Sequence, residues 1–190
     1  MINLTRTFVR QWAREYNRLA RPGDRLEERA INAWLRGQPS RKYLDKTHFV
    51  RLARWSAPRG LNAYRQNDPR LVREATGLAH RVSNERLKVH VLTALQGVSV
   101  TVAAAVLHFL NPRRFPVFDI RARSTLKKAG FWKRPPADAG LDAWEEYVSI
   151  MRRLSRRLRV SLRDLDKALY AYDRWRPRRR RVAGSTGKSR

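Results

Sequence analysis

The chain contains no cysteine among its 190 residues, and this absence excludes several kinds of site. Disulfides, thiolate zinc sites, iron–sulfur clusters and a cysteine nucleophile all require that residue. Long apolar runs are missing too. The longest, around 98–110, contains Thr101 and His108 and is too short to span a bilayer. The first residues do not combine a basic region with an apolar run, so no segment predicts secretion.

Acidic residues are scarce: 16 Asp and Glu stand against 43 Lys and Arg, a formal net charge of +27. Arginines fill 178–181, but most of the basic residues lie before Asp173. Such an excess is typical of a protein that binds a polyanion. The alternative is a generally arginine-rich protein from a GC-rich genome. We favour nucleic acid over a membrane surface, because no helix pairs a clean apolar face with a basic one.

Apolar residues recur at helical spacing along most of the chain, as Phe8, Trp12, Tyr16 and Leu19 do, and no extended alternating strand pattern is present. The sequence therefore predicts an all-α, compact, two-lobed helical fold for residues 1–175. The Arg-, Gly- and Ser-rich segment 176–190 is expected to be a disordered basic tail. The expected helices cover 5–19, 25–36, 44–54, 69–77, 84–95, 100–110, 119–129, 141–158 and 161–175, with a loop at 55–60.

A glycine joins two of these helices within the predicted hairpin 84–110. The joint, segment 95–99 (LQGVS), is so short that Gly97 should adopt a left-handed backbone conformation. Free amides at the start of the second helix could then bind a DNA phosphate. An ordinary helix–glycine–helix corner explains the same short motif equally well. Farther along, segment 115–119 (FPVFD) brings Asp119 to the start of the helical segment 119–129, where a carboxylate is a natural N-cap.

Together these segments resemble the helix–hairpin–helix (HhH-GPD) DNA glycosylase superfamily, which includes endonuclease III and the adenine glycosylase acting opposite oxidised guanine. The family pattern is a Leu-Pro-Gly-Val-Gly hairpin, a helix of small residues and an aliphatic segment ending in Asp. Here these are 95–99, then 101–105 (TVAAA), then 115–119. The resemblance is tight over 92–126 and looser over 53–175.

The resemblance implies that Asp119 is the catalytic residue. Breaking an N-glycosidic bond builds positive charge on the deoxyribose ring, which a fixed carboxylate stabilises while it orients or deprotonates the attacking water. Thr101 stands where bifunctional members carry the lysine that forms a Schiff base, so the resemblance implies a monofunctional enzyme. Gly97, Val98, Ser99 and Thr101 would bind DNA, although Ser99 replaces the second hairpin glycine. The family's iron–sulfur cluster is not carried over, because its cysteines are absent.

A base must leave the duplex before attack, so aromatic residues are candidates for stacking or gap filling. Trp55, in the expected loop, is the first choice, and a core position between helices is the competing interpretation. Arg121 and Arg123 are candidates for contacting the phosphates, or they form a solvated helix face. His108 is expected to be a hydrogen-bonded core residue, and no residues have metal-ligand spacing. No motif selects a general acid from four glutamates: Glu15, Glu27, Glu28 and Glu74.

Two functions remain open from the sequence. The first is a monofunctional glycosylase that excises a damaged base, or a hypermodified base of foreign DNA such as phage DNA. The second is a non-catalytic DNA-binding protein with the same hairpin. Either predicts double-stranded DNA as partner, no membrane partner, a monomer, and a DNA-associated protein of the bacterial cytoplasm. No cofactor is predicted, apart from a monovalent cation that family hairpins often bind through backbone carbonyls.

Overall fold

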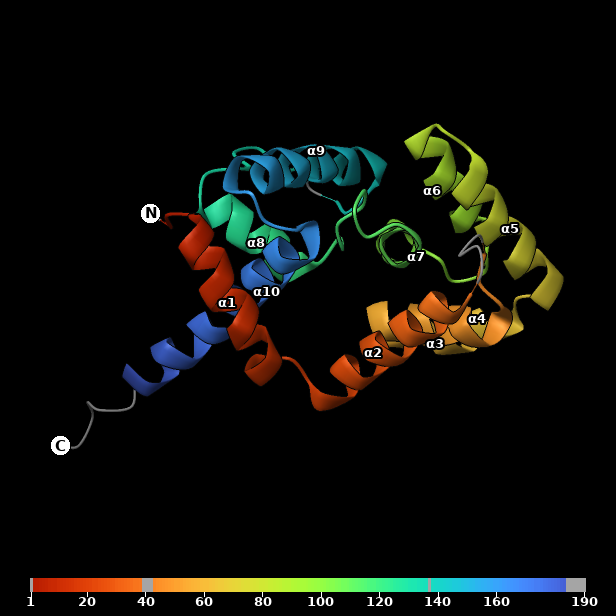
Figure 1. The fold of residues 1–190 in the computed structure, drawn as a ribbon, viewed down its shortest axis with the longest axis horizontal. Helices are drawn as coiled ribbons and strands as arrows, with labels where there is room; N and C mark the ends of the chain where they lie inside the picture. Colours follow the sequence, from red (N-terminus) through yellow and green to blue (C-terminus); the bar gives the residue numbers. More distant parts are fainter. Residues whose placement is uncertain (1, 39–42, 137, 184–190) are drawn as a thin grey trace.

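The structure is a computed structural model that describes residues 2–38, 43–136 and 138–183. Throughout this part of the chain the regular elements are helices, so the predicted all-α class is confirmed (Figure 1). The elements are α1 (Arg6–Leu19), α2 (Pro22–Gly37), α3 (Lys46–Ser56), η1 (Pro58–Gly60, a 3-10 helix), α4 (Leu61–Gln66), α5 (Pro69–Arg81), α6 (Glu85–Thr93), α7 (Val100–Leu110), α8 (Ile120–Lys128), α9 (Leu141–Leu158) and α10 (Leu162–Ala183).

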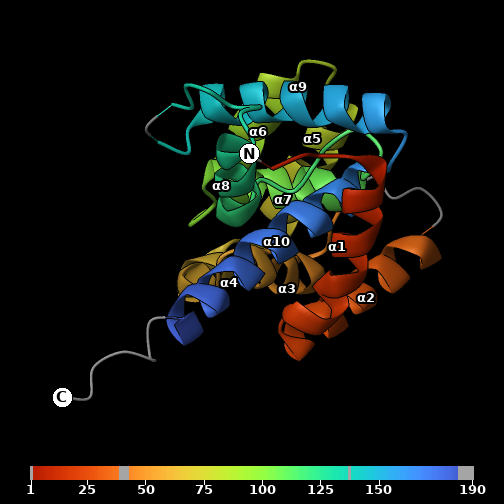
Figure 2. The same cartoon turned by 90° about the vertical axis from the view of Figure 1, so that its left-hand side faces the viewer.

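The helices form two groups on either side of α7. Helices α1, α8, α9 and α10 make the first lobe, and α2 to α6 make the second (Figure 1). Helix α1, near the N-terminus, packs along α10, although most of the chain separates them in sequence (Figure 2). Because α7 contacts α3 and α6 of the second lobe and α9 of the first, the two lobes share one hydrophobic core.

The central helix α7 is buried from Val102 to Leu110. Its alanines 103–105 have no exposed surface, and small side chains at these positions allow the neighbouring helices to approach closely. The predicted bounds 100–110 are those observed, as are the bounds 141–158 of α9. Strong apolar patterning made these two helices the most predictable.

Several predicted boundaries are wrong, and the physical reason differs from one helix to the next. Helix α2 begins at Pro22 rather than after Asp24, because proline fits the first turn of a helix. Helix α5 runs through the buried Gly77 to Arg81, since tertiary packing outweighs the low helix propensity of one glycine. Helix α6 ends at Thr93, two residues earlier than expected.

Two segments expected to be irregular are partly helical. Residues 55 and 56 belong to α3, and most of the remaining expected loop forms η1, which leads directly into the unexpected short helix α4. Helix α10 continues to Ala183, beyond its expected end at residue 175, and disorder of the basic tail 176–190 stays a prediction. Arginine has a high helix propensity, which favours such an extension. Residues 184–190 lie outside the described residues.

Candidate functional site

The turn between α6 and α7 has the predicted left-handed glycine. Gly97 has φ 78°, and the Val98 N–H donates to the Leu95 carbonyl oxygen over 3.1 Å. Ser99 is the N-cap of α7, where its hydroxyl accepts from the Val102 N–H at 3.4 Å. Serine at this position therefore caps the second helix of the hairpin instead of serving as a second flexible glycine.

A buried asparagine, which sequence reasoning missed, holds this turn in place. Asn67, 1% exposed, accepts the Gln96 N–H at its Oδ1 over 2.7 Å and donates from Nδ2 to the Gln96 carbonyl oxygen over 3.1 Å. Both polar backbone groups of one hairpin residue are thus paired with a single side chain. In the sequence, Asn67 precedes the Asp68-Pro69 helix start. No local pattern there indicates a contact with a hairpin residue 29 positions later.

Gly97→Ala is expected to destabilise the protein by about 1–3 kcal/mol, because a non-glycine residue in the left-handed region is strained. A Cβ atom at this position would also lie 2.8 Å from the Ala63 Cβ and 3.1 Å from a ring carbon of Tyr64. Urea denaturation measures the loss. Gly23→Ala in α2 is the control, because a Cβ there meets no atom within 4 Å. Equal stability of the two variants would contradict the packing argument.

Asp119 is the N-cap of α8, as predicted. Its Oδ1 accepts the Arg121 N–H at 2.7 Å and the Ala122 N–H at 3.2 Å, and in the described part of the chain no hydrogen bond reaches Oδ2. Burial raises the pKa of Asp119, an effect that the two backbone hydrogen bonds and the charges of Arg121 and Arg163 partly offset. The arrangement is a rigid carboxylate with one oxygen fixed and the other unengaged.

A buried ion pair joins the two lobes. Arg163 of α10 donates to both carboxylate oxygens of Glu28 on α2, at 2.8 and 2.7 Å, and its Nη2 donates to the Tyr16 hydroxyl at 3.3 Å. Burial raises the pKa of Glu28, but the charge and hydrogen bonds of Arg163 outweigh it and leave the pKa below its ordinary value. Among the four glutamates considered, Glu28 is therefore the buried one, and it stays ionised.

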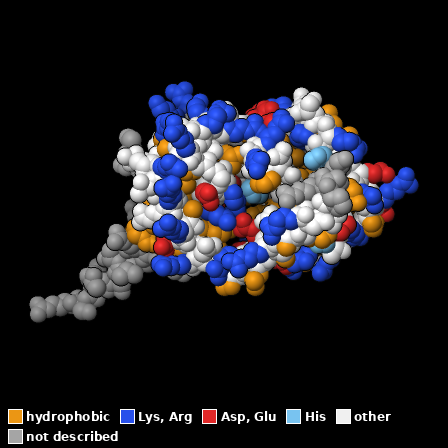
Figure 3. Space-filling model, viewed as in Figure 1, with side chains coloured by type: hydrophobic (Ala, Val, Ile, Leu, Met, Phe, Trp, Pro, Cys, Tyr) orange, Lys and Arg blue, Asp and Glu red, His pale blue; other side chains and the backbone are white. Residues whose placement is uncertain are grey.

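Charged side chains of both signs meet in the hollow at the centre of the face in Figure 3, while Lys and Arg cover much of both lobes.

His108 of α7 is 4% exposed, and its Nδ1 lies 2.8 Å from the Phe115 carbonyl oxygen. Burial and the nearby charge of Arg163 lower the pKa of His108 to about 4, so the imidazole is neutral and Nδ1 donates. His108 is thus the hydrogen-bonded core histidine predicted from the sequence.

Trp55 lies in α3 and not in a loop. Its Nε1 donates to the Asp24 carbonyl oxygen at 3.0 Å, and its ring packs edge-on against Phe109 with centroids 5.3 Å apart. The Arg163 guanidinium lies 5.8 Å from the ring centroid. The half-buried indole is therefore anchored beside the ion pair, and base stacking by Trp55 stays a prediction.

The two arginines after Asp119 both contact the protein. Arg121 lies 3.5 Å from the Asp173 carboxylate. Arg123 donates to the Asp138 carbonyl oxygen at 3.1 Å, and its guanidinium lies 4.7 Å from the Phe118 ring centroid. Their contact with phosphates stays a prediction. Thr101 is half-buried in the first turn of α7.

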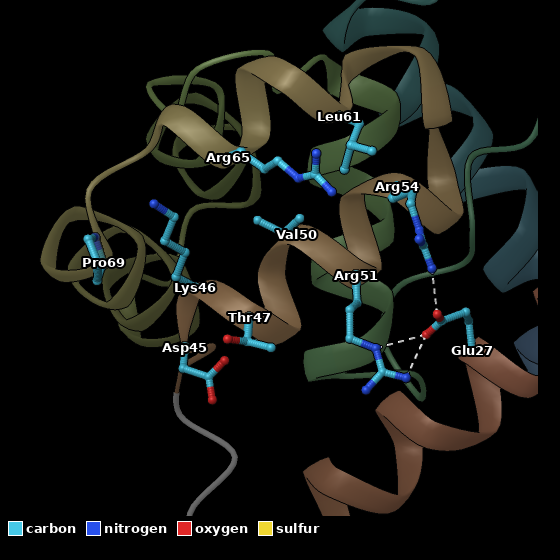
Figure 4. Close-up of a pocket in the computed structure, with 10 residues that line it drawn as sticks. All are labelled: Glu27, Asp45, Lys46, Thr47, Val50, Arg51, Arg54, Leu61, Arg65 and Pro69. Carbon is cyan, nitrogen blue, oxygen red and sulfur yellow. Dashed lines mark hydrogen bonds and ion pairs between the residues drawn. The ribbon is translucent and has the colours of Figure 1, made fainter.

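An open groove of about 930 Å³ lies on the second lobe, over α3 and α4 (Figure 4). Glu27 accepts hydrogen bonds there from Arg51 at 2.9 Å and Arg54 at 2.6 Å, while Lys46 and Arg65 add further positive charge. Asp119 does not line this groove. We therefore count it as part of the basic surface and separate it from the candidate catalytic centre.

Comparisons with known proteins add little. No protein-family model and no curated protein matches the chain. It is similar to a crystal structure of Methanocaldococcus jannaschii 8-oxoguanine glycosylase/lyase in complex with 15mer DNA containing 8-oxoguanine, with 14% identity and a TM-score of 0.43, over 86% of this chain and 88% of that one.

No described helix is long and apolar enough to cross a membrane. In the described ranges, no group of three or more His, Asp or Glu could hold a metal ion. Assignment of function therefore depends on the site itself.

Proposed function

We propose that this protein is a monofunctional DNA glycosylase that hydrolyses the N-glycosidic bond of a flipped base and leaves an abasic site. The observation that carries the proposal is the Asp119 carboxylate, fixed at the start of α8 by Oδ1 with Oδ2 unengaged. The left-handed turn at Gly97 and the large positive charge support DNA as partner. This charge suits an enzyme that searches duplex DNA. The proposal also places it in the bacterial cytoplasm and treats it as a monomer.

In the proposed reaction, Asp119 stabilises the positive charge that develops on the deoxyribose ring as the bond to the base breaks. Its free oxygen orients the attacking water and accepts the water proton, so that the sugar keeps a hydroxyl group. The base departs with the electron pair of the broken bond, and a base that leaves as an anion takes a proton from solvent. Glu28 is a poor proton donor to the leaving base because its lowered pKa keeps it ionised. Excision therefore favours bases that leave readily, such as alkylated or deaminated ones.

The monofunctional assignment depends on the absence of a suitable amine at position 101. Thr101 cannot form a Schiff base with the sugar. Lys88 is 4% exposed, and its ammonium donates to the carbonyl oxygens of Ala79 and His80, so it is committed to the fold. Lys128 donates to Asp173. We expect no strand cleavage without alkali and no trapping of the enzyme on DNA by borohydride.

DNA contact is proposed for the hairpin residues Gly97, Val98, Ser99 and Thr101. Amides at the start of α7 could approach a phosphate there. A monovalent cation at the hairpin carbonyls remains part of the proposal. The Gln96 carbonyl oxygen, however, already accepts a hydrogen bond from Asn67 and has only its second lone pair available for a cation.

The test is a panel of duplexes carrying damaged and modified bases, together with hypermodified phage genomes, followed by alkali to reveal abasic sites. Base release with strand breaks only after alkali supports the proposal. Strand cleavage without alkali contradicts the monofunctional assignment. If no substrate in the panel loses a base, the non-catalytic DNA-binding protein becomes the better description, with Asp119 acting only as a helix cap. A positive substrate also separates repair of damaged DNA from defence against modified phage DNA.

Duplex affinity is expected to fall steeply with salt, because Lys and Arg that contact phosphates release counterions from DNA. If about six or more phosphates are contacted, the affinity should drop on the order of 10³-fold or more between 50 and 200 mM salt. Fluorescence anisotropy with an undamaged duplex measures this dependence. Affinity that does not change over this range would contradict DNA binding through the positive surface.

A further inference from the structure

Both polar backbone groups of Val117, two residues before Asp119, are held by side chains from other helices. The Val117 N–H donates to Asp166 Oδ2 on α10 at 2.8 Å. The Val117 carbonyl oxygen accepts from the Tyr147 hydroxyl on α9 at 3.0 Å, and that hydroxyl lies 2.9 Å from Asp166 Oδ1. Asp166 and Tyr147 thus close a ring of hydrogen bonds around one residue of the segment that leads to Asp119.

We propose that Asp166 and Tyr147 are positioning residues that set the place of the Asp119 carboxylate by clamping Val117. The inference depends on the proposed role of Asp119 and adds two residues that the sequence analysis did not single out. The Asp119 N–H itself donates to the Val117 carbonyl oxygen at 3.1 Å. A shift of Val117 is therefore passed directly to the backbone of Asp119.

The two clamp residues are buried deeply enough for this role. Asp166 is 3% exposed and the Tyr147 side chain is fully buried, so water cannot replace their hydrogen bonds without opening the core. They come from two different helices of the first lobe. Helix α8 is independently attached to α10 by Thr125, whose hydroxyl donates to the Leu169 carbonyl oxygen at 2.9 Å. The clamp therefore fixes the entry to α8 against a frame that already holds its body.

A protonated Asp166 satisfies every polar group of the clamp. Its O–H can donate to the Tyr147 oxygen while the Tyr147 O–H donates to Val117 and the other carboxyl oxygen accepts the Val117 N–H. Burial and the charge of Asp119 raise the pKa of Asp166 to about 7, although Arg163, the Val117 N–H and Tyr147 act in the opposite direction. Two further charges act on the clamp: Arg121 lowers the pKa of Asp119, and Arg123 lowers the pKa of Tyr147.

Ionisation of Asp166 should loosen the clamp. The Tyr147 O–H then has a carboxylate to donate to, and the Val117 carbonyl oxygen keeps only the Asp119 N–H. The rate of base release should therefore fall as the pH rises through about 7, the pKa of Asp166. A residue with a purely structural role would not place a titration step at this position in the rate profile.

Asp166→Asn tests this step, because an amide donates to Tyr147 and accepts from Val117 at every pH. The expected result is a rate near that of the wild type below pH 7 and loss of the decline above it. Persistence of that decline in Asp166→Asn would overturn the role of Asp166. The Asp166 pKa, followed by carbon-13 NMR, should also fall in Asp119→Asn, a measurement that does not depend on base release.

Tyr147→Phe tests the other half of the clamp. Misplacement of Asp119 is expected to lower the single-turnover rate by up to about 10²-fold with unchanged duplex affinity. The matched control is Thr76→Val in the second lobe. It also removes a buried hydroxyl, one that donates to the Val72 carbonyl oxygen at 2.8 Å. Amide hydrogen exchange at Val117 should become faster in Tyr147→Phe only.

The two proposals fail in different ways. A rate in Tyr147→Phe no lower than in Thr76→Val, with unchanged Val117 exchange, overturns the clamp and leaves the glycosylase assignment intact. A second outcome is that Tyr147→Phe exchanges the Val117 amide faster but the wild type releases no base from any substrate. The hydrogen bonds to Val117 then stabilise only the fold. In that case the role assigned to Asp119, and the positioning function built on it, are both rejected.

Discussion

Asp119→Asn is expected to lower the rate of base release on the order of 10³-fold, the cost of removing one preorganised charge from a developing transition state. The substitution keeps the shape of the side chain and removes only its negative charge and its ability to accept a proton. The positive sugar then has no carboxylate beside it, and the water loses its base. Single-turnover kinetics with saturating enzyme measure the effect without interference from product release.

The fold should survive this change, because asparagine is as good an N-cap as aspartate. Its carbonyl oxygen can still accept the Arg121 and Ala122 N–H groups that Asp119 now accepts. The matched control is Asp68→Asn at the start of α5, where Asp68 accepts two backbone N–H groups in the same way. Normal base release by Asp119→Asn would reject the catalytic role. A loss of equal size in Asp68→Asn would mean that capping and not charge explains the effect.

The same carboxylate should give the pH profile of base release an acid limb. Because burial raises the pKa of Asp119, the group takes up a proton at a higher pH than an exposed aspartate does. Activity should therefore disappear on acidification with a midpoint above the ordinary aspartate value of 3.8. Whatever activity Asp119→Asn retains should lack this limb.

Glu28→Gln is expected to reduce the free energy of unfolding by about 3–5 kcal/mol, because Arg163 loses the anion that compensates its buried charge. For a chain of this length, that loss corresponds to a fall in Tm on the order of 10 °C. Lys167, whose ammonium lies 3.5 Å from Glu28, loses an anion as well. The lost ion pair is the one that links α2 of one lobe to α10 of the other. Thermal unfolding followed by circular dichroism measures the change in stability.

Glu74→Gln provides the control, since Glu74 pairs with Arg70 in an exposed i,i+4 contact and its loss should lower the Tm far less than Glu28→Gln does. The pH dependence adds a second check. The folded-state pKa of Glu28 lies below its ordinary value of 4.5, so the ion pair stabilises the fold above pH 4.5 and loses this effect as the pH falls through the folded-state pKa. The difference in stability between wild type and Glu28→Gln should therefore narrow in acid. A constant difference would point to packing instead of charge.

The features that could be predicted from the sequence are those that depend on residues close together in the chain. The left-handed Gly97 follows from the shortness of the joint between two helices, and the N-cap role of Asp119 follows from its place before a helical pattern. The end of α5 could not be predicted in this way, because Gly77 is a helix breaker whose burial decides the outcome. The expectation that Trp55 lies in a loop was wrong for a different reason. The turn-forming residues after Trp55 suggested an early helix end, but α3 continues to Ser56.

The contacts that complete the site join residues far apart in the chain. Arg163 meets Glu28 across 135 positions, and Asp166 meets Val117 across 49. Only one of these four residues, Glu28, was a candidate before the fold was known. A weak signal existed for Asp166, which shares the apolar face of α10 with Leu162 and Leu169 and is an acid where a core residue is expected.

By itself, the sequence determined the all-α class, the positive charge, the hairpin and the capping carboxylate, because periodicity, composition and caps act over a few neighbouring residues. The tertiary structure alone decided which groups surround Asp119, which glutamate is buried in an ion pair and what holds the hairpin and Val117 in place. These properties depend on burial and on distances between helices from different parts of the chain. Desolvation and partner charges then set the protonation of each buried group.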